Sequence, residues 1–147
     1  MPSEYPRYHV HALVARRATL ELAIEGVTGA RLLPLRFGLA RLPVTDELLA
    51  TLGPPGAPAA IEFVRLTPAL VRFAVEASRR GPIAYLECEV ADGAGFHAAL
   101  AWQGGASVLG PLHREDRSPA NAALRLLGVA AGGGADEFTA LGIAALC

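Results

Sequence analysis

The second half of the chain alternates between apolar and polar positions with the period of two that is typical of strands. Ile83 to Ala91 and Phe96 to Trp102 alternate in this way, and a glycine-containing turn, Asp92 to Gly95, separates them. Gly104-Gly105 marks a second turn before a third short run, Ala106 to Leu109. These three runs predict an antiparallel three-stranded meander.

The first part of the chain contains further short apolar runs, some with the strand period of two and some with the helical period of 3.6. Tyr8 to Val14 alternates and predicts a strand, and Arg31 to Leu42 predicts one or two short strands interrupted at Pro34. Thr19 to Glu25 fits both periods. Its Ala, Leu and Glu residues, together with the stop signal at Gly26, favour a helix.

Four further helices are predicted from the residues at their starts, where a capping side chain or a proline favours the first turn. They are a short helix after Thr45, a helix from Thr67-Pro68 to about Arg80, a helix from Ser118-Pro119 to Gly128, and a short helix over 136–141. Helices and hairpins follow one another without strict βαβ alternation. The sequence therefore predicts a single α+β domain over residues 1–147, with a mainly antiparallel sheet and four or five helices.

Composition supports one domain with its own core and excludes several classes of protein. The chain has 147 residues, of which 52% are hydrophobic and 18% are charged, so a core can form without disulfides or metals. Its apolar runs are all shorter than the ~18 residues of a transmembrane helix. Cys88 and Cys147 do not form a C-x-x-C pair, and reduced thiols in a cytoplasmic protein fit them best.

Charge is balanced overall but unevenly distributed along the chain. The formal net charge is −1, which argues against a nucleic-acid-binding protein. Residues 1–80 hold ten Arg and seven acidic residues, whereas residues 81–147 hold three Arg and seven acidic residues. The second half is therefore expected to present an acidic surface to a basic partner. In the alternative, the two halves interleave in space and the asymmetry averages away.

Glu87 and Glu89 lie two residues apart on one face of a predicted strand and are the best candidates for paired carboxylates. Like charges at this spacing raise one pKa, which general acid–base catalysis exploits. The alternative is a solvated outer face opposite the apolar residues of the same strand.

The surroundings of these carboxylates depend on the register of the hairpin. A turn that pairs Ala91 with Phe96 places Leu100 opposite Glu87 on the carboxylate face. A slip of one residue places His97 on that face instead, since successive side chains point to opposite sides of a sheet. Both registers remain open.

Other polar groups form weaker candidates. His9 and His11 share one strand face, but no acid can be assigned there as a third ligand, so no metal site is expected. His113 lies in a predicted charged loop, and histidine is the side chain that titrates near neutrality. The alternative is a solvated, internally paired loop. Ser107 falls short of the G-x-S-x-G motif, and acids follow Gly132 to Gly134 where a phosphate loop has Lys and Ser or Thr.

Several segments of the second half resemble a group of uncharacterised small proteins from high-GC actinobacteria and their relatives, which has no established activity. The segments are Gly81 to Glu89, Phe96 to Trp102, Leu109 to Leu112, Leu126 to Val129 and Ala135 to Phe138. The group's turn reads Phe-Gly-Gly-x-Gly, whereas this chain has Ala-Asp-Gly-Ala-Gly at residues 91–95. In size and style the chain is also similar to immunity proteins of bacterial polymorphic toxin systems.

Together these observations predict a non-enzymatic cytoplasmic binding protein without a cofactor. It would be an immunity protein that neutralises a bacterial toxin domain by occluding its active site. Acidic side chains would meet a basic cleft, and an aromatic residue would anchor the contact. The expected contact residues are Glu87, Glu89, Trp102, Glu115, Asp116, Asp136 and Glu137. The alternative is a small enzyme or ligand-binding domain that uses Glu87 and Glu89 with His97 or His113.

Overall fold

The computed structural model describes residues 8–54, 59–60, 62–91, 94–133 and 135–143. Within these ranges the strands are β1 (Tyr8–Arg16), β2 (Leu33–Pro34), β3 (Leu39–Pro43), β4 (Ile83–Ala91), β5 (Ala94–Gln103) and β6 (Ala106–Arg114). The helices are α1 (Arg17–Ala23), α2 (Asp46–Leu52), α3 (Pro68–Ala77), α4 (Ser118–Leu126) and α5 (Glu137–Leu141), with a 3-10 turn at Ser78–Arg80. The predicted α+β class, the meander and the number of helices are confirmed.

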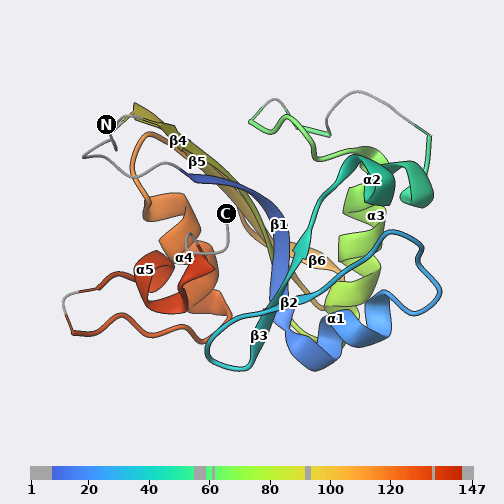
Figure 1. The fold of residues 1–147 in the computed structure, drawn as a ribbon, viewed down its shortest axis with the longest axis horizontal. Coiled ribbons are helices and arrows are strands. Elements are labelled where there is room, and N and C mark those ends of the chain that lie inside the picture. Colours follow the sequence, from blue (N-terminus) through green and yellow to red (C-terminus); the bar gives the residue numbers. More distant parts are fainter. Residues whose placement is uncertain (1–7, 55–58, 61, 92–93, 134, 144–147) are drawn as a thin grey trace, which may run out of the picture.

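The strands form one antiparallel sheet in the order β2-β3-β1-β4-β5-β6. The first long strand of the chain thus pairs with the first strand of the meander, and the two halves of the chain share one sheet. Figure 1 shows this sheet between two groups of helices, with α1, α2 and α3 on one face and α4 and α5 on the other. We call these the α1–α3 face and the α4–α5 face.

Burial on both faces changes the pattern of the central strands. Side chains of Ile83 to Cys88 are all buried, as are those of Ala12 to Ala15. Tyr8, Val10 and Leu86 pack on the α4–α5 face. Because helices cover both faces, alternate positions that look like solvated strand face in the sequence are interior positions.

The β4–β5 register is neither of the two that the sequence left open, and it differs by two residues from the one that pairs Ala91 with Phe96. Ala91 pairs with Ala94, and Glu87 therefore lies opposite Ala98, not Leu100. Each strand extends further into the turn, as the frequent two-residue hairpin connection favours. Asp92 and Gly93, the turn itself, lie outside the described residues. The two-residue shift keeps every side chain on its predicted face, because the side-chain period is also two.

Gly95 permits this tighter pairing. It lies opposite Val90 with a φ of +155°, and a Cβ atom at this position would stand 1.8 Å from the carbonyl oxygen of Glu89. Only glycine lets the two backbones approach in this way.

Two other local predictions need correction. The segment around His113 and Arg114 is not a loop but the end of β6, because β6 extends five residues beyond the predicted Leu109. The start of α4 is not capped by the Ser118 side chain: Ser118 is the first helical residue, and its backbone N–H donates to the Asp116 carboxylate (2.8 Å). Thr45 and Thr67, in contrast, cap α2 and α3 as predicted.

Candidate functional site

The seven residues expected to contact a partner differ in their exposure. Glu87 is 0% exposed and Trp102 is 3% exposed, so neither can meet a partner. The Glu89 side chain is half-buried, and Glu115 and Asp116 are exposed. The expectation that Glu87 and Trp102 form part of a binding surface is therefore wrong, because helices and loops cover the face of the sheet on which they lie.

Glu87 is the centre of a buried hydrogen-bond network on the α1–α3 face. Its carboxylate accepts hydrogen bonds from the backbone N–H groups of Val64 (2.7 Å) and Arg65 (2.8 Å) and from the Tyr85 hydroxyl (2.6 Å). Burial, followed by the neighbouring Glu87, raises the pKa of Tyr85 above its usual range. The phenol therefore stays protonated as a donor, and Glu87 serves to hold the segment before α3 against the sheet.

His9, His11 and Glu89 come together where β1 pairs with β4. His9 lies directly opposite Glu89 in the register. The Oε1 atom of Glu89 is 2.9 Å from His9 Nε2 and 3.7 Å from His11 Nε2, and the two imidazole rings are 4.1 Å apart. The third ligand, an acid that could not be assigned from the sequence, is thus supplied by β4.

His11 is the least satisfied member of this cluster. Its side chain is 8% exposed, and its Nε2 atom is buried without a hydrogen-bond partner. Burial, followed by the neighbouring His9, lowers the pKa of His11. A buried polar atom without a hydrogen-bond partner costs about 1–3 kcal/mol of folding free energy. The His11 imidazole therefore destabilises the fold as long as its Nε2 atom has no partner.

A shallow pocket of about 210 Å³ adjoins the cluster. It opens where β3 leaves β1, since the pairing of these strands begins only at Ala12 and Pro43. Arg65 contributes to its wall and forms an ion pair with Asp46. His9 is therefore accessible from solvent along one side, whereas His11 is almost completely buried beside it.

A second cluster lies at the same end of the sheet, on the α4–α5 face. The Tyr8 hydroxyl is 2.7 Å from His97 Nε2, and Arg117 Nε donates to the same hydroxyl at 3.4 Å. The Arg117 guanidinium also lies 5.1 Å from the centre of the Phe138 ring and 3.6 Å from Asp136. Neither Tyr8 nor Arg117 stands out in the sequence, because their association depends on contacts between distant segments.

The buried His97 makes stability depend on pH. Burial, followed by the positive charge of Arg117, lowers the pKa of His97 to about 4, while Asp116 and Asp136 act in the opposite direction. In the unfolded chain the imidazole has a pKa of about 6.5. As pH falls below 6.5 the unfolded state binds a proton that the folded state does not, so stability is lost until the folded pKa is reached.

We therefore expect the free energy of unfolding to fall by about 2 kcal/mol between pH 7 and about pH 4.5 through His97 alone. Urea denaturation of the wild type and of His97→Gln at both pH values measures this contribution as the difference between the two pH-dependent losses. Equal losses in both proteins would show that His97 is not neutral in the folded state.

Asp136 and Glu137 bind groups of this same chain, so little of their charge is available to a partner. Asp136 caps α5 by accepting from the Thr139 backbone N–H (2.9 Å) and also accepts from the Asn121 amide (3.1 Å). Glu137, whose side chain is 12% exposed, is 3.3 Å from Arg125. Both acids stabilise the contact between α4 and α5.

The residues of the enzymatic alternative do not lie together in the structure. Glu87 points to the α1–α3 face and His97 to the α4–α5 face, so the sheet separates them. His113 stacks on Phe96 with ring centres 5.0 Å apart. Ser107 lies on β6 as predicted. Gly132 and Gly133 are described, and Gly132 pairs with Ala135, but Gly134 lies outside the described residues.

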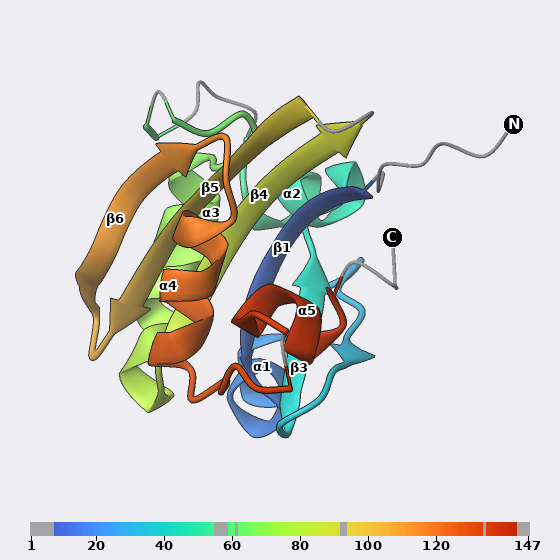
Figure 2. The same ribbon diagram turned by 90° about the vertical axis from the view of Figure 1, so that its left-hand side faces the viewer.

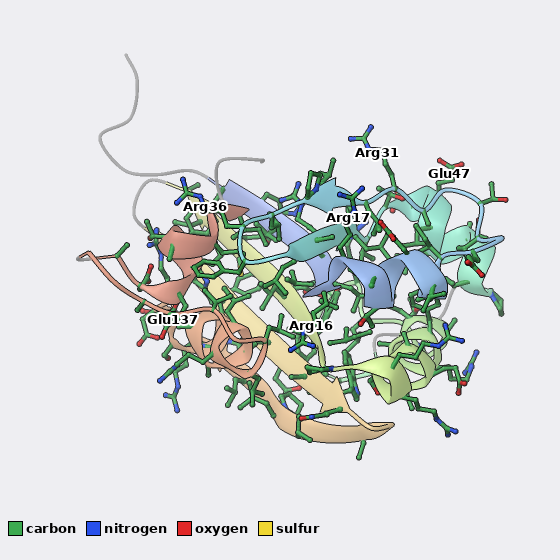
Figure 3. All side chains as sticks on the ribbon, turned by 90° about the horizontal axis from the view of Figure 1, so that it is seen from below. Arg16, Arg17, Arg31, Arg36, Glu47 and Glu137 are labelled. Atoms are coloured by element: carbon green, nitrogen blue, oxygen red, sulfur yellow. The ribbon has the colours of Figure 1, made fainter. Side chains whose placement is uncertain are left out.

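Charged side chains separate along the strand direction. The register brings the end of β1, the start of β3 and the start of β4 to one end of the sheet, which Figure 3 views directly. Five exposed arginines lie there: Arg16, Arg17, Arg36, Arg79 and Arg80. Some of this positive charge is compensated by acids, since Glu21 pairs with Arg17 and Glu76 with Arg79. We call this the basic end.

The opposite end carries the exposed acids of the second half. Glu89 lies opposite Phe96 on β5, and β6 ends at Arg114, opposite His97, just before Glu115 and Asp116. Figure 2 shows the corresponding ends of β4 and β6 along the upper edge of the sheet, away from α1. We call this the acidic end. The two halves do interleave in the sheet, but the charge asymmetry survives along the strands.

Comparisons with known proteins add no relative. No protein-family model matches the chain, and neither the search of curated proteins nor the search of solved structures returns a match. Within the part of the chain that the structure describes, no helix has the length and apolarity needed to cross a membrane.

Proposed function

We propose that this protein is a non-enzymatic cytoplasmic binding protein that recognises a basic surface of a protein partner, as an immunity protein does when it covers the active site of a toxin domain. The observation that carries the proposal is the separation of charge along the strands. A molecule with one acidic and one basic end is oriented by the field of a basic partner, which speeds productive encounter.

The proposed contact surface is smaller than the set of seven residues expected from the sequence, because only three of those residues are exposed acids at the acidic end. Glu89, Glu115 and Asp116 remain from the set suggested by the sequence, with Arg114 and Arg117 as basic neighbours. Neighbouring strands lie ~4.8 Å apart, so the ends of β4 and β6, two strands apart, are separated by roughly 10 Å. That separation suits a single contact area on a partner.

Charge reversal at the acidic end tests this proposal. The partner is captured with the tagged protein from the native host at low salt, and its association rate is then measured by surface plasmon resonance. We expect Glu115→Arg to slow association several-fold and to weaken its dependence on salt, because exposed charges act mainly on the encounter.

Glu76→Arg is the matched control. Glu76 is exposed and lies at the basic end, so this variant changes the net charge equally without altering the acidic end. Equal slowing by both variants would show that only net charge matters, and no slowing by Glu115→Arg would place the contact elsewhere.

A further inference from the structure

Three groups with metal-ligand chemistry converge on one point at the acidic end. His9 and His11 lie on the same face of β1, and Glu89 lies on the adjacent β4 in register with His9. Their ligand atoms all lie within 4.8 Å of one another. Two imidazole nitrogens and one carboxylate oxygen form a set that suits divalent first-row transition metals, whereas Mg²⁺ and Ca²⁺ prefer oxygen ligands alone.

The distances suit an ion at the centre of the cluster. Transition metals such as Zn²⁺ bind nitrogen and carboxylate oxygen at about 2.0–2.2 Å, which puts neighbouring ligand atoms of a tetrahedral ion roughly 3.3 Å apart. The Oε1 atom of Glu89 is 2.9 Å from one histidine nitrogen and 3.7 Å from the other. Shifts of about 0.4 Å would bring both of these distances to the tetrahedral value. The two histidine nitrogens lie within 4.8 Å of each other, so side-chain rotation has to close the remainder of that gap.

His11 supplies an independent indication of a missing ligand. Its side chain is more than nine-tenths buried, and its Nε2 atom points toward Glu89 yet has no hydrogen-bond partner. A buried imidazole nitrogen normally has a partner. A metal ion between His11, His9 and Glu89 would provide one.

We propose that His9, His11 and Glu89 bind one divalent transition metal ion through the two Nε2 atoms and the Glu89 carboxylate. The shallow pocket beside the histidines leaves a further coordination position open to water or to a group on a partner. This site shares Glu89 with the contact surface proposed above, but the observations behind it, the ligand geometry and the buried His11 nitrogen, do not rest on that proposal.

Zinc binding by the tag-free protein tests the proposal. After removal of metal with a chelator, isothermal titration calorimetry with Zn²⁺ is expected to give one site per chain, with a Kd on the order of 1 µM or tighter. Excess Mg²⁺ or Ca²⁺ is expected not to compete. The absorption spectrum of the Co²⁺ complex should show nitrogen and oxygen ligation without a thiolate charge-transfer band, which excludes binding at a cysteine.

Substitutions of the ligands locate the site. His9→Gln and Glu89→Gln change partly exposed side chains and are each expected to weaken Zn²⁺ binding at least about tenfold. His113→Gln is the matched control, since it removes an exposed histidine on β6 at the same end of the sheet and should leave binding unchanged. Circular dichroism of each variant verifies folding.

Two results would overturn the assignment. One is the absence of saturable Zn²⁺ binding by the folded wild-type protein, and the other is binding that survives both ligand substitutions. Neither result bears on partner recognition, because the charge-reversal test uses Glu115 and Glu76 and leaves the three ligands intact.

Discussion

Replacing Glu87 with Gln is expected to lower the free energy of unfolding by about 2–3 kcal/mol. The side chain is fully buried, and its carboxylate accepts three hydrogen bonds. Gln keeps the volume but has one acceptor oxygen, and its NH₂ group must then face a donor from Val64, Arg65 or Tyr85. Hydrogen bonds to charged groups contribute about 1.5–3 kcal/mol, and a buried donor left unpaired adds a desolvation cost.

Urea denaturation measures this loss, and hydrogen exchange locates it. The backbone N–H groups of Val64 and Arg65 should lose protection first, because Glu87 is their acceptor. Glu115→Gln removes the same charge from an exposed position and should change stability by no more than about 0.5 kcal/mol. If Glu87→Gln were as mild as this control, the carboxylate would not be required for the fold.

Truncating Trp102 to Ala is expected to have an even larger effect, about 3–5 kcal/mol. Trp102 is 3% exposed and pairs with Ile83 and Ser107 in neighbouring strands. It packs in the core of the α1–α3 face together with Leu100. Removing the indole leaves a cavity among side chains that can close it only in part.

Thermal denaturation of the free protein measures this effect as a fall in Tm of roughly 10 °C. Trp102→Phe retains most of the apolar volume and should lose less than half as much. A Trp102→Ala variant that keeps the wild-type Tm would contradict this role of the indole in the core.

The sequence alone predicted the local structure well. Alternation located the three strands of the meander, and Thr45 and Thr67 marked the starts of two helices. These features depend on neighbours within a few residues, through side-chain period and capping hydrogen bonds. The resulting α+β class required no knowledge of distant contacts.

The candidate site could be predicted only in part. The sequence identified Glu87 and Glu89 as carboxylates on one face, yet their roles diverge. Glu87 is a buried structural acceptor because the segment of Val64 and Arg65 covers it. Glu89, two residues further, remains half-exposed and joins His9. The same strand face is interior at one position and surface at the next, which no periodicity can reveal.

Tertiary structure alone decided which chemistry is assembled. The pairing of β1 with β4, whose residues are about 80 positions apart, brings Glu89 to His9 and His11. The same pairing separates arginines from acids along the strands, although the halves of the chain interleave. Local sequence determined the strands and helices because they depend on neighbouring residues. The metal-ligand cluster and the charge separation required tertiary structure, because both arise from which strands lie side by side and in which register.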